Sequence, residues 1–203
     1  MDLINAAPAT ALLILANVLA SLYAFSNRGF LEDGTFIVGA VKSGQLQRLL
    51  TSGFLHVGSW HLVANMVTLF FFGPYVEQAL GTGGFLLVYF ASLLGGNGWA
   101  LVENWRKPNY AAIGASGATS GVVISFCLFE PFAMLLIFII PMPAIAFAVV
   151  YIVGSAYLST RANTRIGHEA HLGGALTGAV ATLIVEPGAW RSFIDAMTAA
   201  LGG

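Results

Sequence analysis

The chain of 203 residues is 58% hydrophobic and only 8% charged, and its mean hydropathy is +0.83. This composition predicts an integral membrane protein and excludes an ordinary soluble domain. The net charge of −1 leaves no basic face, so nucleic acid is excluded as a partner. Because a helix needs ~20 residues to cross the hydrocarbon, the chain has room for about six spans and little else. We therefore expect a single transmembrane domain over residues 1–203.

Apolar runs separated by Gly, Pro and charged residues predict an all-α fold, a bundle of six transmembrane helices. The glycine-rich segment 81–84 separates the second and third helices, and Glu130-Pro131 ends the fourth. Glycines in the segment 95–98 are expected to interrupt the third helix and let neighbouring backbones approach. The predicted helices cover approximately residues 8–25, 59–80, 85–102, 115–129, 144–158 and 169–185.

A long connection, residues 27–58, joins the first two predicted helices. It keeps aromatic residues, among them Phe30, Phe36 and Phe54. Long loops with such content are usually folded, so this loop is expected to pack on the bundle or to be partly embedded in the membrane interface.

The fourth predicted helix is too short to span a bilayer. About 15 residues cover only ~22 Å, so one end should lie below the membrane surface. Ser116 stands at that end, after Gly114-Ala115. Irregular backbone at membrane depth requires protein or water around it, so the segment before Ser116 predicts a water-filled cavity.

A histidine on the last predicted helix is the matching polar residue. His171 heads a glycine stripe with Gly174 and Gly178, and Gly117 and Gly121 form a small-residue face on the fourth helix. Close packing of these faces would bring His171 to Ser116. A serine hydroxyl becomes a good nucleophile when a base accepts its proton, and a neutral histidine can do so.

Donors for a developing oxyanion are also present. His61 and Asn65 are four residues apart on the second predicted helix and so project from one face. The free N–H groups at the start of the fourth helix, near Ser116, are further candidates.

At these residues the sequence resembles the rhomboid intramembrane serine proteases. The resemblance rests on three motifs in the family's order: His61-Leu62-Val63-Ala64-Asn65, Gly114-Ala115-Ser116-Gly117 and Ala170-His171-Leu172-Gly173-Gly174, followed by Gly178. It covers about residues 48–186. Weaker agreement comes from Arg48 and Thr51 before His56, and from Glu77 and Gly81; in the family such residues help to hold the first loop.

The resemblance implies a catalytic dyad in which Ser116 is the nucleophile and His171 the general base and then acid. It also implies an oxyanion hole formed by His61, Asn65 and the Ser116 N–H. Substrates would be other transmembrane proteins in the lipid bilayer, cut in or next to a membrane segment that unwinds readily. No cofactor and no metal are implied, and the expected location is a bacterial inner membrane.

Two positions depart from the family pattern. Many rhomboids carry an aromatic residue four positions after the nucleophile, stacked on the catalytic histidine, and here that position is Ser120. The family often has Trp before the loop arginine, whereas Gln47 precedes Arg48.

The main alternative function is a rhomboid-like protein that binds membrane clients without cutting them. A zinc protease would need histidines four apart around a glutamate, but His168 and His171 are three apart. An aspartyl protease fails because Asp2, Asp33 and Asp195 lie outside the predicted helices. A small transporter would show a repeat between its halves, and none is found.

Overall fold

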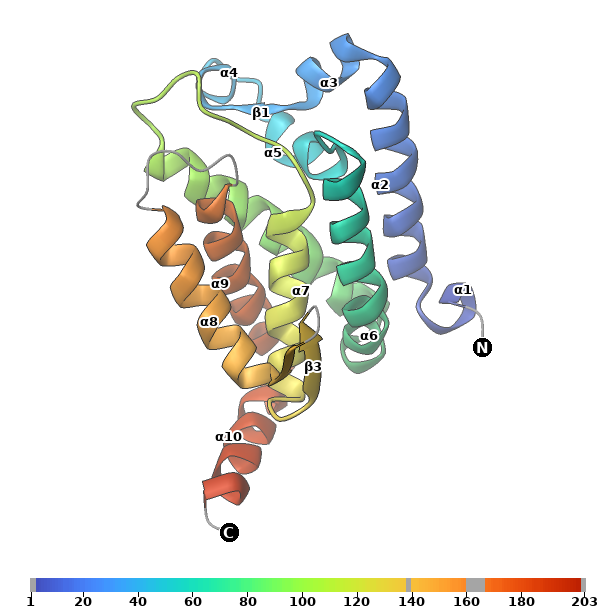
Figure 1. Cartoon of the computed structure of the whole chain (residues 1–203), viewed down its shortest axis with the longest axis vertical. Coiled ribbons are helices and arrows are strands. Elements are labelled where there is room, and N and C mark those ends of the chain that lie inside the picture. The colour runs from blue at the N-terminus through green and yellow to red at the C-terminus, as the bar shows by residue number, and fades with distance from the viewer. Residues whose placement is uncertain (1–2, 138–139, 160–166, 202–203) are drawn as a thin grey trace.

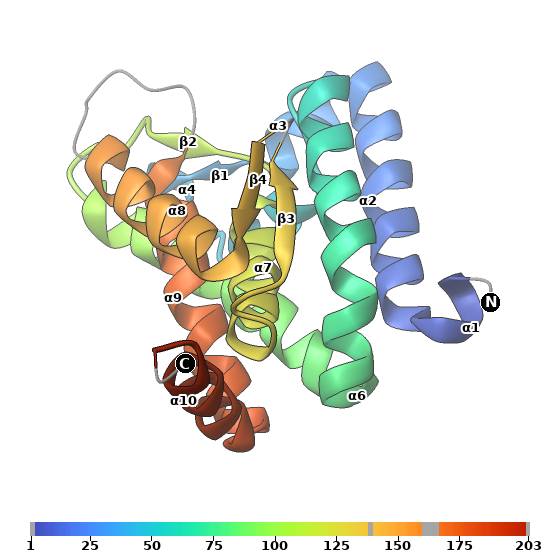
Figure 2. The same cartoon turned by 60° about the horizontal axis from the view of Figure 1, so that its bottom comes forward.

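The computed structural model describes residues 3–137, 140–159 and 167–201 and shows a bundle of helices with two small antiparallel strand pairs (Figures 1 and 2). A 3-10 turn, Ser52–Phe54, precedes the longest helix. The helices are α1 Leu3–Ala6, α2 Pro8–Ser26, α3 Arg28–Gly34, α4 Val38–Lys42, α5 Arg48–Thr51, α6 Ser59–Glu103, α7 Ser116–Phe129, α8 Ala144–Ser159, α9 His168–Val185 and α10 Gly188–Leu201. The strands are β1 Phe36–Ile37, β2 Ala111–Ala112, β3 Met134–Ile137 and β4 Ile140–Pro143.

Two helices in the described part of the chain, α2 and α6, are long and apolar enough to cross a membrane. The pair α9 and α10 passes the same criterion together, although the two helices are bent by 106° relative to each other. The α7 and α8 helices are apolar but shorter. The helical segments therefore fall where the apolar runs lie, with α2 over the predicted range 8–25 and α9 over 169–185.

The α6 helix combines the predicted helices 59–80 and 85–102. At Gly81 the backbone leaves the helical conformation, with φ 69° and ψ 162°, and the chain changes direction at the lower end of α6 in Figure 1. Glycine adopts this conformation without the steric cost of a Cβ. The predicted interruption at 95–98 is wrong, because the helix continues through these residues. A Cβ on Gly173 of α9 would lie 2.9 Å from the Gly95 carbonyl oxygen, so the glycines allow close packing without breaking the helix.

Glycines also bring α7 and α9 together. A Cβ added to Gly174 would overlap the backbone of Gly117, and one added to Gly178 would overlap the backbone of Gly121. Backbones can approach this closely only where side chains are absent. Because Ser116 begins α7 and His171 lies in the first turn of α9, this contact determines how near the two residues lie.

The N-terminus of α2 is tied to α6 by a buried carboxylate. Glu77 accepts hydrogen bonds from the backbone N–H groups of Ala9 and Thr10 at 3.0 and 2.8 Å. The hydroxyl groups of Thr10 and Thr82 donate to the same carboxylate. Negative charge beside free N–H groups at a helix start is stabilising. Glu77 therefore joins the start of α2 to the turn at Gly81.

The connection between α2 and α6 is folded rather than irregular. Its strand β1 pairs antiparallel with β2, which lies just before the segment leading to Ser116. Arg48 is 8% exposed, and its guanidinium donates to the carbonyl oxygens of Glu32 and Thr35 at 2.6 and 2.7 Å. The Thr51 hydroxyl donates to the Gly34 carbonyl oxygen at 3.0 Å. Arg48 and Thr51 thus hold the turn between α3 and β1.

Replacing Arg48 with Ala should lower the free energy of unfolding by roughly 1–3 kcal/mol, because two carbonyl oxygens lose a charged donor. Thermal unfolding in detergent measures the change. Arg28→Ala is the matched control, since its only ion pair in the described residues is with exposed Glu32 and is worth at most about 0.5 kcal/mol. Equal losses in the two variants would contradict the role assigned to Arg48.

The elements that were not predicted from the sequence include the strands β3 and β4 and the helix α10. Strands β3 and β4 form an antiparallel pair within the connection that follows α7, with Met134 opposite Pro143. Helix α10 extends away from the bundle beyond α9 (Figure 1). It exposes Trp190 and Ile194 together with Arg191 and Asp195, so both apolar and charged side chains are accessible along it.

Candidate active site

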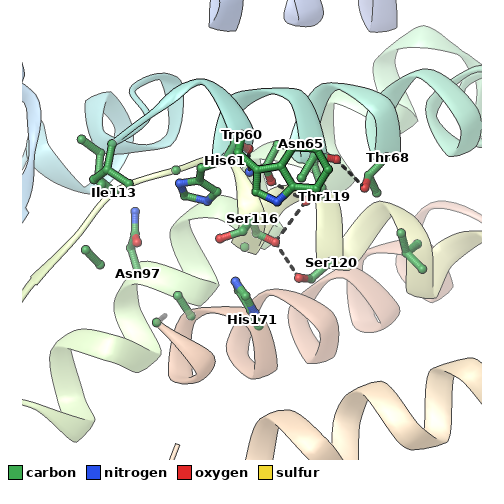
Figure 3. Close-up of a pocket in the computed structure, with 18 of the residues that line it drawn as sticks. Trp60, His61, Asn65, Thr68, Asn97, Ile113, Ser116, Thr119, Ser120 and His171 are labelled. Carbon is green, nitrogen blue, oxygen red and sulfur yellow. Dashed lines mark hydrogen bonds between the residues drawn. The ribbon is translucent and has the colours of Figure 1, made fainter. Parts of the chain in front are cut away.

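A cavity of about 700 Å³ lies between α6, α7 and α9. Four side chains predicted to act together line it: Ser116, His171, His61 and Asn65. Figure 3 shows Ser116 between His61, which projects from α6, and His171, which projects from α9. A cavity of this size can hold water and an extended segment of polypeptide. Polar groups thus converge inside an otherwise apolar bundle.

Ser116 is the first residue of a helix of 14 residues. At 1.5 Å per residue α7 is roughly 21 Å long, so in a bilayer of ~30 Å its start lies below one surface. The preceding Gly114 has φ 128°, and its N–H donates to the Ser52 carbonyl oxygen at 2.9 Å. A Cβ on Gly114 would overlap the His61 ring. The positive φ angle and this close approach of His61 both favour glycine at position 114.

His56 fixes the residue before the serine. Its Nε2 accepts the N–H of Ala115 at 3.4 Å, and its Nδ1 lies 2.8 Å from the Ser21 hydroxyl oxygen. The Ser21 hydroxyl donates to the Phe54 carbonyl oxygen, so Nδ1 carries the proton and donates to Ser21. Burial, and then the neighbouring His61 ring, lower the pKa of His56 to about 4. A neutral ring is the form that can accept the Ala115 N–H.

The Asn65 amide is held from two sides. Its Nδ2 donates to the His61 carbonyl oxygen at 2.9 Å. Its Oδ1 accepts from the Thr119 hydroxyl at 3.1 Å, and this hydroxyl shares its one proton with the Ser116 carbonyl oxygen at 3.2 Å. The second N–H of the amide is therefore available to the cavity. Thr119 belongs to α7, one turn after Ser116, so α7 orients the α6 amide beside its own first residue. The role of Thr119 could not be read from the sequence.

His171 is surrounded by rings. The imidazole lies nearly parallel to Tyr151 of α8, with ring centroids 6.1 Å apart and an interplanar angle of 18°. The His168 ring contacts it edge-on at 5.8 Å. Glu169, between the two histidines, accepts from the Asn104 side chain at 3.0 Å, which ties the start of α9 to the end of α6. Tyr151 was not selected from the sequence, because nothing in its local pattern distinguishes it.

Metal binding has no obvious site in the described part of the chain. No group of three or more His, Cys, Asp or Glu side chains is arranged there to hold an ion. The His168, Glu169 and His171 cluster instead shows ring packing and the hydrogen bond from Asn104.

Apolar helices that enclose a cavity lined by a serine and a histidine are typical of a multi-pass membrane protein with an internal site. The chain belongs to the rhomboid family, because the family model described as Rhomboid domain matches residues 43–187. That range includes Ser116, His171, His61 and Asn65. The family also contains relatives named as proteases.

Several named proteins are similar to the chain. RHOMBOID-like protein 12, mitochondrial, of Arabidopsis thaliana is 30% identical over 88% of this chain and 59% of its own length. Rhomboid protein 1, mitochondrial, of Saccharomyces cerevisiae is 33% identical over 64% of this chain and 39% of its own. Rhomboid protease GluP of Bacillus subtilis is 37% identical over 40% of this chain and 15% of its own.

These relatives are longer than the matched region. The chain spans 59% of the Arabidopsis protein and 39% of the yeast protein. Both of these relatives are named as mitochondrial, so the expectation of a bacterial inner membrane is not supported by them. The chain is therefore described as a multi-pass membrane protein, without a named membrane.

Proposed function

We propose that this protein is an intramembrane serine endopeptidase that hydrolyses peptide bonds in or next to transmembrane segments of other membrane proteins. The observation that carries the proposal is the convergence of Ser116, His171, His61 and Asn65 on one cavity of about 700 Å³. Membership of a family with protease-named relatives supports it. All six predicted helical segments are taken to lie within the membrane, with the α6 segments on either side of Gly81 counted separately and with α7 too short to cross the whole bilayer.

The first half of the reaction forms an acyl-enzyme. The Ser116 Oγ attacks the carbonyl carbon of the scissile peptide bond while His171 removes its proton. The His171 imidazolium then gives this proton to the leaving nitrogen as the C–N bond breaks. A dyad needs no carboxylate if the packing around the imidazole fixes its orientation, and the rings of Tyr151 and His168 provide such packing.

The tetrahedral intermediate carries its negative charge on the former carbonyl oxygen. Its donors are the second amide N–H of Asn65, the His61 ring and the free N–H of Ser116 at the start of α7. Donors that are already fixed in place stabilise the developing charge without reorganising during the reaction. Thr119 contributes by holding the Asn65 amide in one orientation.

The second half of the reaction needs water. His171 accepts a proton from a water molecule in the cavity, the resulting hydroxide attacks the acyl carbon, and the proton returns to Ser116 as the ester breaks. A substrate helix must unwind to place its backbone at Ser116, so segments rich in helix-destabilising residues are the favoured substrates. No cofactor is needed for these steps.

The test is cleavage of a single-span membrane protein by the purified chain in liposomes. Appearance of two fragments, with a cut mapped by mass spectrometry to the membrane segment or its flank, is the expected result. A folded chain that binds such substrates and leaves them whole would favour the client-binding alternative.

Replacing Asn65 with Ala should lower kcat by about 10²–10³-fold, since one oxyanion donor is lost. KM should change little, because the amide acts mainly in the transition state. Steady-state cleavage kinetics in detergent measure both constants. Asn5→Ala, on exposed α1, is the matched control and should behave like the unmodified chain. A rise in KM with kcat unchanged would contradict the role of Asn65.

A further inference from the structure

The aromatic ring on the catalytic histidine comes from a different helix from the one that the family pattern uses. The position four residues after Ser116 holds Ser120, which is 3% exposed and carries no ring. Tyr151 of α8 instead stacks on His171 in a near-parallel, offset arrangement, at 6.1 Å between ring centroids and 18° between planes. Phe147, one turn earlier on α8, packs on Tyr151 at 5.6 Å. The Tyr151 ring therefore contacts both Phe147 and His171.

Ser120 has a defined part in this arrangement. Its hydroxyl donates to the Ser116 carbonyl oxygen and is hydrogen-bonded to the Tyr151 hydroxyl. A hydroxyl has one proton, so Ser120 gives its proton to Ser116 and accepts the proton of Tyr151. This chain of bonds runs from the backbone of the nucleophile to the ring stacked on the base.

We propose that Tyr151 is a positioning residue that holds the His171 imidazole in its productive orientation, and that Ser120 fixes Tyr151. The proposal rests on the proposed function. A histidine side chain can rotate about its Cβ–Cγ bond, and an aromatic face packed on the imidazole restricts that rotation. Proton transfer from Ser116 requires a ring nitrogen directed at the hydroxyl, so a misaligned ring slows the chemical step.

The small size of Ser120 follows from the same geometry. A ring at position 120 would project into the space where the Tyr151 hydroxyl lies, because the two side chains are in hydrogen-bond contact. One aromatic residue can occupy this space, either from α7 or from α8. In this chain α8 supplies the ring, and Ser120 supplies an acceptor for its hydroxyl.

The test compares Tyr151→Leu, Tyr151→Phe and Ser120→Ala in the liposome cleavage assay and in labelling of Ser116 by a fluorophosphonate. Tyr151→Leu should lower kcat by about tenfold or more, with KM unchanged within about twofold, and should slow labelling in parallel. Tyr151→Phe keeps the ring and should restore most of the activity. Ser120→Ala should give a smaller loss of kcat than Tyr151→Leu.

Tyr23→Leu is the matched control, because Tyr23 is exposed on α2 and does not line the cavity. Unfolding midpoints establish that each variant is folded, and Tyr151→Met replaces Tyr151→Leu if the latter unfolds. A folded Tyr151→Leu protein with unchanged kcat, or a Tyr151→Phe protein as slow as Tyr151→Leu, would overturn the positioning role. If the unmodified chain neither cleaves nor labels, the proposed function fails, and the role of Tyr151 in it fails too.

Discussion

Ser116→Ala and His171→Ala should each reduce cleavage of a single-span substrate by about 10⁴-fold or more, because nucleophile and base act as one unit. The double variant should be no slower than either single variant, for the same reason. Both side chains line one cavity from α7 and α9, and no other serine is placed at the start of α7. Fragment yield against time in liposomes measures the loss.

Ser59→Ala is the matched control for the nucleophile. Ser59 is an exposed serine at the start of α6, so its loss should leave the cleavage rate unchanged. Strictly additive losses in the double variant would show that the two residues do not act in a single step. Full activity of either single variant would remove that residue from the reaction.

Gly174→Ala and Gly178→Ala should destabilise the protein by about 1–3 kcal/mol or more each, because an added methyl group meets backbone. A Cβ at Gly174 overlaps Gly117, and one at Gly178 lies 2.9 Å from the carbonyl carbon of Gly121. Backbone cannot move aside as a flexible side chain can, so α9 must shift away from α7. The expected readouts are a lower unfolding midpoint and a slower cleavage rate in the protein that stays folded.

Gly98→Ala provides the control for these substitutions. Gly98 lies in α6, and a Cβ there meets nothing within 4 Å. Alanine at an open helical position should stabilise by about 0.5–1 kcal/mol. If Gly98→Ala lowered the unfolding midpoint as much as Gly174→Ala does, close contact between α7 and α9 would not be the cause.

Much of the helical framework could be predicted because apolar periodicity and breaker residues are local properties of a chain. Glu130-Pro131 predicted the end of α7, and α7 ends at Phe129. Glycine was less informative. Gly81 reverses the chain, whereas Gly95 and Gly96 lie within an unbroken helix and face α9. A glycine that interrupts a helix and a glycine that allows close packing of two helices can be told apart only when the neighbouring helix is known.

The β3–β4 strand pair and helix α10 were missed. The pairing of β3 with β4 lies in a segment read as a plain connection, since a short apolar run does not reveal its own conformation. The amphipathic α10 follows Glu186-Pro187, where the predicted helices ended. Both the strand pair and α10 lie in segments that were not predicted to form regular structure.

The candidate site shows the same division. Ser116, His171, His61 and Asn65 stand in short motifs and could be selected from the sequence alone. Tyr151, Thr119 and His56 act through contacts between segments that are distant in sequence, such as the His56 bond to Ala115 across 59 residues. The sequence showed that position 120 is a serine and not an aromatic residue. Only the structure showed that Tyr151 of α8 stacks on His171 instead.

The most direct measurement of the central claim is the site at which a fluorophosphonate modifies the protein. The probe forms a bond from phosphorus to an activated serine oxygen and releases fluoride, a step that requires a base. Mass spectrometry of the labelled chain should place one adduct on Ser116 in the unmodified protein and none in His171→Ala. No adduct on Ser116, or an equally rapid adduct in His171→Ala, would contradict a dyad of Ser116 and His171.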